Sequence, residues 1–256
     1  MKSRDFPQYD GALRYHERDG AGRPLVMLHG LGCAASYEFP NVVQTAPLAD
    51  RHVLMLDLYG FGYSDRPKAF GYSISDHAAA LAAFVQALDL GSFDLFGHSM
   101  GGAVAIEAAH LLDGQVAHLI LAESNLDPGI GLVSKTIAAG TEEAYCDQGH
   151  DRIIVMALET GNTAWAATLR ASDPRAVYRG ARSLVQGGQQ SWRELLYAHG
   201  GKKSFFIGQN NLPDPNLDLL PAHGVETFVI PHAGHAMGLD NPAGLAEAIA
   251  QVAPWR

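Results

Sequence analysis

Residues 97–101 read Gly97-His98-Ser99-Met100-Gly101, which is a Gly-x-Ser-x-Gly pattern. A short apolar run precedes the pattern, and an Ala-rich stretch typical of a helix follows it from Ala103. A serine on such a strand–turn–helix corner is held in a strained backbone conformation that exposes its hydroxyl group. The pattern therefore predicts that Ser99 is a nucleophile.

A nucleophilic serine needs a general base. His235 lies in the loop between the last expected strand and the last expected helix, from which a histidine could reach Ser99. We predict that His235 is the base and keep His232, in the same loop, as its rival. We interpret His98 as a packing residue, because its ring would leave the tight turn in a direction different from that of the nucleophile.

These side chains need a rigid frame. Strands that alternate with helices predict an α/β fold, with a mostly parallel sheet covered on both faces. Helices are expected over about 77–89, with Ser75-Asp76 as the N-cap, over 103–112, and after Asn241-Pro242. Short apolar runs beside Gly-rich or polar loops predict strands at 25–28, 53–56, 93–96, 119–121, 204–207 and 226–230.

The strand pattern disappears between about 128 and 200, where the sequence is helical in character. We predict an α/β core formed by residues 1–127 and 201–256, with a helical cap over residues 128–200. Three arginines of this segment, Arg175, Arg179 and Arg182, lie opposite the apolar side of one helix. They could bind an anionic substrate, although a solvated helix face is the usual meaning of this pattern.

Composition narrows the possible partners and location. The 256 residues carry a formal net charge of −9 and no long Lys/Arg cluster, which argues against nucleic acid or an anionic membrane as the main partner. No signal pattern and no apolar run of about 18 residues is present, so we expect a cytoplasmic protein. Cys33 and Cys146 are too few for a disulfide framework, and Cys33 is interpreted as a packing thiol because no base is arranged for it. The oligomeric state cannot be read from the sequence.

Four motifs in a fixed order carry a family resemblance. The chain resembles the α/β-hydrolase superfamily over essentially its full length, and the motifs are specific for the fold but much less so for the substrate. They are His29-Gly30-Leu31-Gly32, the loop from Asp57 to Pro67, the Gly97–Gly101 corner, and Gly234-His235 followed by Asp240-Asn241-Pro242.

The resemblance implies a mechanism. The chain order would be serine, acid, histidine, and two backbone N–H groups would form the oxyanion hole. One N–H would be that of Met100, directly after the nucleophile, and the other that of Leu31, after the first central strand. The mechanism requires no metal and no cofactor.

The acid departs from the usual pattern. Its usual place, about three residues after Gly208, holds Asn211, which cannot carry a negative charge. In some members, including certain haloalkane dehalogenases, the acid instead follows the strand before the cap, and Glu123 occupies that place here. We predict Glu123, because a carboxylate at the end of an apolar strand needs a partner such as an imidazole N–H. Asp214, Asp127 or the absence of any acid remain open.

The nucleophile limits the activity. Haloalkane dehalogenases and epoxide hydrolases of the superfamily attack with an aspartate, whereas Ser99 is similar to the nucleophile of the esterases. We therefore expect hydrolysis of a carboxylic ester in a small-to-medium, largely apolar small molecule. A carbon–carbon bond hydrolase or a perhydrolase would use the same triad, and a ligand-binding pseudoenzyme is the alternative from another class.

Overall fold

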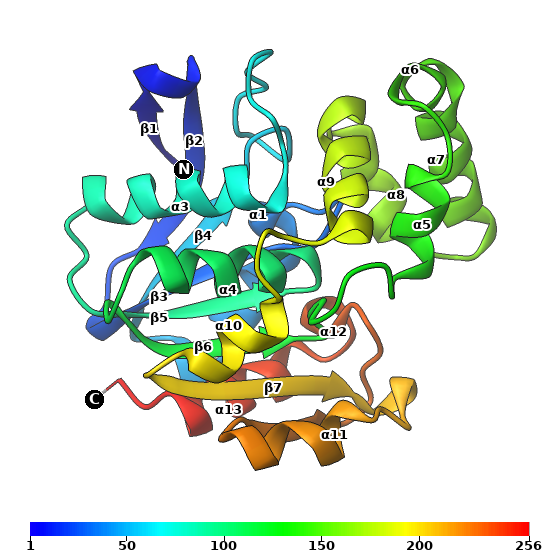
Figure 1. Ribbon diagram of the computed structural model, residues 1–256. Coiled ribbons are helices and arrows are strands. Elements are labelled where there is room, and N and C mark those ends of the chain that lie inside the picture. The colour runs from blue at the N-terminus through cyan, green and yellow to red at the C-terminus, as the bar shows by residue number, and fades with distance from the viewer. Residues whose placement is uncertain (256) are drawn as a thin grey trace.

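The computed structural model describes residues 1–255, and its centre is an eight-stranded sheet (Figure 1). The strand order is β1-β2-β4-β3-β5-β6-β7-β8, and every pairing is parallel except β1–β2 and β2–β4. The predicted α/β class is confirmed. The strands are β1 (Lys2–Phe6), β2 (Gly11–Arg18), β3 (Ala21–Leu28), β4 (Arg51–Asp57), β5 (Phe93–His98), β6 (Val116–Ala122), β7 (Lys202–Gly208) and β8 (Glu226–Ile230).

All six predicted strands lie in this sheet, but the sequence analysis missed β1 and β2. These two strands form the antiparallel edge, and most of their residues are exposed or half-buried. Buried parallel strands read as continuous apolar runs, whereas an antiparallel edge strand carries polar residues on its solvated side. The sequences of β1 and β2 therefore contain no apolar run that would predict a strand.

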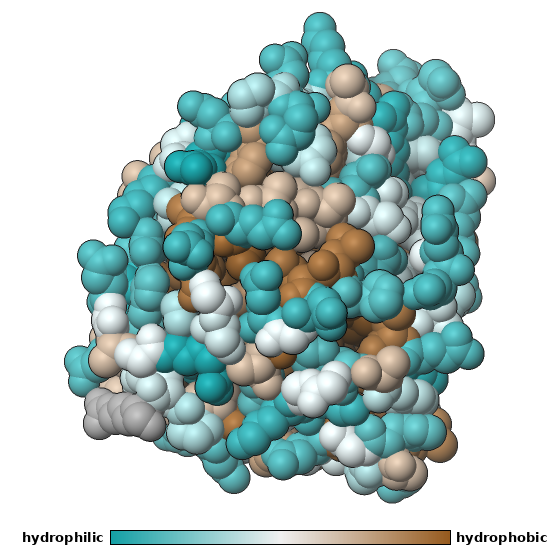
Figure 2. Space-filling view, turned by 60° about the vertical axis from the view of Figure 1, so that its left-hand side comes forward, coloured by the Kyte–Doolittle hydropathy of each residue, from teal (hydrophilic) through white to brown (hydrophobic). Residues whose placement is uncertain are grey.

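Helices cover both faces of the sheet and enclose two separate apolar cores. Figure 1 shows α3 (Ile74–Ala87) and α4 (Met100–Leu111) over the near face, where α10 (Trp192–Ala198) also contacts α4. The other core joins the sheet to α1 (Ala35–Glu38), α2 (Pro40–Val43) and α13 (Pro242–Val252). Figure 2 shows a face that is mostly hydrophilic, with hydrophobic side chains visible in hollows between the polar ones.

The start of α3 differs from the expectation. Ser73, rather than Ser75-Asp76, is the N-cap, and its hydroxyl oxygen accepts a hydrogen bond from the backbone N–H of Asp76. The Asp76 carboxylate in turn accepts from the backbone N–H of Ser73, which completes a capping box. The helix consequently begins three residues before the predicted start at residue 77.

Between β6 and β7 the chain forms helices and no strand within residues 1–255. In Figure 1 the green and yellow-green helices of this segment gather beside one end of the sheet, while α10 lies over the core. That this segment is a separate cap over residues 128–200 stays a prediction. Its elements before α10 are α5 (Leu132–Ala138), α6 (Glu142–Ala144), η3 (Tyr145–Gly149), α7 (His150–Glu159), α8 (Thr163–Arg170) and α9 (Pro174–Gln186).

Candidate active site

Ser99 lies at the corner between β5 and α4, and its backbone is strained. Its φ of 52° and ψ of −117° are outside the regions that a residue with a side chain ordinarily adopts. The corner has no room beside it, because a Cβ added to Gly97 would lie 2.4 Å from the carbonyl oxygen of Gly101. A Cβ on Gly101 would lie 2.5 Å from the carbonyl oxygen of His29. The flanking glycines thus permit the tight turn that the motif predicts.

Three side chains from distant segments form one hydrogen-bonded chain. The Oγ of Ser99 lies 3.1 Å from Nε2 of His235, and Nδ1 of His235 lies 3.2 Å from Oε2 of Glu123. Glu123 directly follows β6, and His235 lies between β8 and α12 (Met237–Asp240). When Nδ1–H donates to the carboxylate, Nε2 is free to accept the proton of the Ser99 hydroxyl.

The Glu123 carboxylate is held by three donors. Besides His235, the backbone N–H of Gly208 and the Nδ2 of Asn211 each donate to its Oε1 at 2.8 Å. Burial acts to raise the pKa of Glu123, but the hydrogen bonds from His235, Gly208 and Asn211 outweigh it and lower that pKa. The carboxylate is therefore ionised at neutral pH and can stabilise an imidazolium on His235.

The other acid candidates do not reach His235. Asp214 accepts a hydrogen bond from the backbone N–H of Asn216 at 2.6 Å, in the turn that begins α11 (Asn216–Leu219). Asp127 forms an ion pair with Arg193. Among the carboxylates of residues 1–255, only that of Glu123 bonds to the His235 ring.

Of the two residues predicted to supply the N–H groups of the oxyanion hole, Met100 directly follows Ser99, and Leu31 lines the same cavity as Ser99. Met100 is the first residue of α4, so its N–H has no acceptor within the helix. Leu31 lies in the turn after β3, and a Cβ on the preceding Gly30 would be 3.3 Å from the Cβ of Ser99. The indole Nε1–H of Trp165 donates to the carbonyl oxygen of Leu31 at 2.9 Å, which ties α8 to this turn. Sequence reasoning missed this contact, since nothing near Trp165 indicates its distant acceptor.

The alternative base His232 and the thiol of Cys33 do not take part in the hydrogen bonds that join Ser99, His235 and Glu123. His232 is exposed, and its backbone N–H donates to Gln209 at 3.0 Å. Cys33 is half-buried and its Sγ lies 3.7 Å from the carbonyl oxygen of Leu31. Burial raises the pKa of the Cys33 thiol well above its usual range, which makes it a poor nucleophile at neutral pH.

His98 does more than pack. Its ring is buried, Nε2 donates to the carbonyl oxygen of His235 at 2.7 Å, and Nδ1 lies 2.5 Å from Oε1 of the buried Glu38. Burial acts to lower the pKa of His98, but Glu38 and the His235 carbonyl outweigh it and raise that pKa. The pair therefore links α1, the end of β5 and the loop that carries His235. The sequence offered no signal for Glu38, because nothing local to α1 shows which residue it meets.

The side chains of Ser99, His235 and Glu123 line a cavity of about 430 Å³. Its wall is largely apolar and combines the turn after β3 with residues of the segment between β6 and β7. A cavity of this size suits a small-to-medium organic molecule. The apolar side chains that line it include Leu31, Ile130, Leu132, Val133, Trp165 and Leu184.

The predicted arginine stripe does not line this cavity. Arg179 pairs with Glu142 at 2.7 Å, and Arg175 pairs with Asp173 at 3.3 Å. Arg182 is exposed. The stripe therefore faces solvent and neighbouring acids, as an ordinary polar helix face does.

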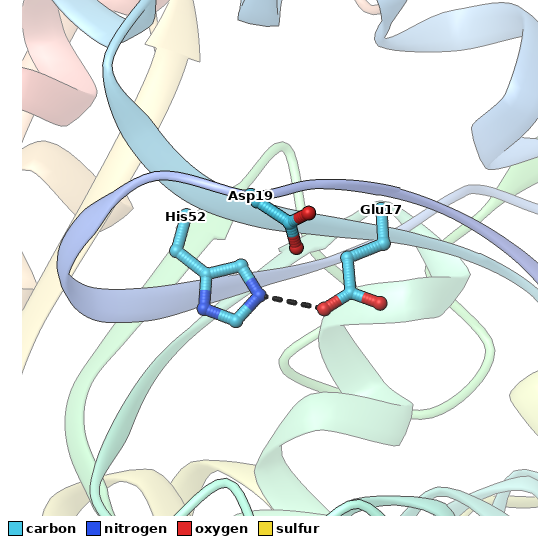
Figure 3. Close-up of side chains that lie close together, drawn as sticks. All are labelled: Glu17, Asp19 and His52. Carbon is cyan, nitrogen blue, oxygen red and sulfur yellow. Dashed lines mark hydrogen bonds and ion pairs between the residues drawn. The ribbon is translucent and has the colours of Figure 1, made fainter.

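A separate cluster on β2, β4 and the turn between β2 and β3 could offer metal ligands. Glu17, Asp19 and His52 present ligand atoms that all lie within 4.8 Å of one another (Figure 3). Both oxygens of Glu17 are already engaged, one with His52 at 2.9 Å and the other with Lys2 at 2.7 Å. An ion-pair network explains this cluster, and none of its residues lines the cavity.

Comparison with known proteins agrees with this architecture. The sequence model of the family described as alpha/beta hydrolase fold matches residues 23–144. A thermophilic esterase from Thermogutta terrifontis superposes with a TM-score of 0.79 at 21% identity, over 94% of this chain and 92% of that chain. At this identity the likeness concerns the fold. No helix within residues 1–255 is both long and apolar enough to span a membrane.

Two curated relatives are more similar in sequence, each over part of the chain. The chain is 36% identical over 104 residues to the 2-hydroxy-6-oxo-2,4-heptadienoate hydrolase of Pseudomonas putida, which covers 40% of this chain and 37% of the relative. It is 34% identical over 121 residues to haloalkane dehalogenase 2 of Mycobacterium bovis, which covers 45% of this chain and 41% of the relative. Each match spans less than half the length of the relative.

Proposed function

The chain belongs to the α/β-hydrolase superfamily, and from this premise we propose that it is a serine hydrolase that cleaves a carboxylic ester through an acyl-enzyme. The observation that carries the proposal is the chain of contacts from Ser99 through His235 to Glu123, with spacings of 3.1 and 3.2 Å. A hydroxyl group, an imidazole and an ionised carboxylate in this order supply the nucleophile, the general base and the group that orients the base.

The residues then have defined roles. As the Oγ of Ser99 bonds to the ester carbonyl carbon, its proton passes to Nε2 of His235, and the carbonyl electron pair moves onto oxygen. The N–H groups of Leu31 and Met100 donate to this oxyanion, and each well-placed donor lowers the barrier by about 3 kcal/mol. The alcohol leaves with the proton from His235. Water repeats the sequence on the acyl-enzyme and releases the acid.

The segment over residues 128–200 acts in this proposal as a cap. Its helices α5 and α8 contribute residues to the cavity wall, and Trp165 contacts the turn that carries Leu31. An apolar wall favours a small-to-medium, largely apolar small-molecule ester. We place the reaction in the cytoplasm, since neither Cys33 nor Cys146 is in a disulfide.

Two alternatives lie within the same superfamily. The Pseudomonas putida relative is named a heptadienoate hydrolase, which describes a substrate with a carboxylate. A carbon–carbon bond hydrolase or a perhydrolase would use the same three side chains. The alternative from another class is a ligand-binding protein that keeps the fold without catalysis.

The deciding experiment is covalent labelling. A fluorophosphonate probe should modify the wild-type protein at Ser99, located by peptide mass spectrometry, and Ser99→Ala should lose the label. Release of p-nitrophenol from p-nitrophenyl butyrate should be lost in the same variant. Absence of both labelling and ester cleavage in the wild type would favour the binding protein.

A further inference from the structure

We propose that the cavity selects esters that carry no negative charge and discriminates against substrates with a second, ionised carboxylate. This inference rests on the proposed function of the same site. It concerns the charge of the substrate, which neither the fold nor the three reacting side chains determine.

The first observation is the set of charges on the cavity wall. Among the residues 1–255 that line it, Glu38 and Glu123 carry carboxylates, and there is no lysine or arginine. The imidazole of His98 is already paired with Glu38, and that of His235 with Glu123 and Ser99. A substrate carboxylate would leave water for a site that offers no unpaired cation, next to two groups of its own sign.

The basic residues of the surrounding helices lie outside the cavity wall, including Lys135 on α5 and Arg170 on α8, whose side chains are exposed to solvent. Arg175 and Arg179 on α9 are held by Asp173 and Glu142, and Arg193 on α10 is held by Asp127. None of these arginines lines the cavity. The formal net charge of −9 gives the whole molecule a field of the same sign.

The second observation is an apolar rim at the mouth of the cavity. Ile130, just before α5, and Leu132 and Val133, in its first turn, line the cavity and are 57%, 79% and 39% exposed. Apolar side chains that stay in water beside a cavity gain stability when an alkyl group covers them. The rim therefore favours an uncharged hydrocarbon part at the place where a second polar group of the substrate would lie.

The test compares three p-nitrophenyl esters with the same six-carbon acyl backbone. They are p-nitrophenyl hexanoate, the neutral methyl p-nitrophenyl adipate, and the mono-p-nitrophenyl adipate, which is ionised at about pH 7.5. We expect kcat/KM of the ionised ester, corrected for its spontaneous hydrolysis, to be at least about fivefold below that of the methyl ester. A smaller difference would overturn the proposal, because the methyl ester has nearly the same size and the same oxygen acceptors as the ionised ester and differs from it chiefly in carrying no charge.

A pair of rim variants tests the electrostatic cause. Leu132 is largely exposed, so Leu132→Arg and its uncharged control Leu132→Gln leave the core intact. The ratio of kcat/KM for the ionised ester to that for the methyl ester should be at least about threefold higher in Leu132→Arg than in Leu132→Gln. An equal ratio in the two variants would show that charge is not the cause.

Failure of the proposed function gives a different result. If the wild type cleaves none of the three esters, ester hydrolysis is refuted, and the charge selection is measured as binding to Ser99→Ala by calorimetry. Weaker binding of the ionised ester than of the methyl ester, by about fivefold or more, would still support the selection. Dissociation constants of the two esters that differ by less than about fivefold would refute the charge selection.

Discussion

Asn211 donates a hydrogen bond from its Nδ2 to Oε1 of Glu123 at 2.8 Å. In the sequence, Asn211 occupies the usual place of the acid, so the acid seems to be missing there. In the structure, the same side chain is a donor to a carboxylate that comes from the end of β6 and contacts His235 with its other oxygen. A carboxamide at this position is chemically suited to a neighbouring carboxylate, because it can donate without adding a second negative charge.

Replacement of Glu123 tests the identity of the acid. We expect Glu123→Gln to lower kcat on a short-chain aryl ester by roughly 10³- to 10⁴-fold, because an amide no longer stabilises the imidazolium. The matched control is Asp214→Asn, which should stay close to the wild type because Asp214 bonds only within its own turn. Loss of activity in Asp214→Asn alone would disprove the assignment of Glu123.

Substitution of an aspartate at the usual position of the acid should lower the activity. Asn211→Asp would put a second carboxylate beside Oε1 of Glu123, and the pair would retain a proton to a higher pH. We expect kcat/KM near neutral pH to fall by about tenfold or more, with the acidic limb of its pH profile moved upward. Asn211→Ala, which removes the donor without adding charge, should move that limb less. An Asn211→Asp profile identical to the wild type would contradict this account.

The contact between Trp165 and Leu31 should matter for the chemical step. Trp165→Phe keeps an aromatic ring but removes the indole N–H that donates to the Leu31 carbonyl oxygen at 2.9 Å. We expect kcat to fall by about three- to tenfold, a fraction of what complete loss of one oxyanion donor costs. Trp192→Phe is the control, since its indole donates to Glu107 away from the cavity. Equal losses in both variants would point to general destabilisation.

The pair of Glu38 and His98 should make stability depend on pH. The pKa of His98 is raised on folding, so the stabilisation is complete below the unfolded value near 6.5 and is lost as pH rises through the folded value. We therefore expect the gap in unfolding free energy between the wild type and Glu38→Gln to be larger at about pH 6 than at about pH 9. Urea denaturation at both values measures it. A gap that widens with pH would reverse the assigned direction.

His77 should act in the opposite direction, in acid. Its ring lies among Phe61, Phe70 and Tyr72, neither ring nitrogen has a hydrogen-bond partner within residues 1–255, and burial lowers its pKa to about 3. The unfolded chain binds this proton at a higher pH, so the folded state loses about 1.4 kcal/mol per pH unit as pH falls from about 6.5 towards 3.

The variant His77→Phe should reduce the steepness of this acid loss by about that amount, measured by urea denaturation between about pH 4 and pH 7. His110→Gln, at an exposed position of α4, is the control and should leave the slope as it is in the wild type. If both variants show the wild-type slope, another group causes the acid sensitivity.

The sequence by itself determined the local parts of this protein. The Gly-x-Ser-x-Gly corner needs only its own backbone geometry, and the positive φ of Ser99 agrees with the strain that the motif implies. The buried parallel strands were predictable because each is a short apolar run. The superfamily was predictable as well, since it depends on the order of such local motifs along the chain.

Only the tertiary structure decided which distant side chains meet. Asn211 lies 88 positions after Glu123 in the chain, and His235 lies 112 positions after it. Their contacts with Glu123 depend on how β6, β7 and β8 lie beside one another. The same holds for Glu38 beneath His98. A residue's own neighbours in sequence encode its helix, strand or turn, whereas its partners across the fold follow from the packing of the whole sheet, which no single segment specifies.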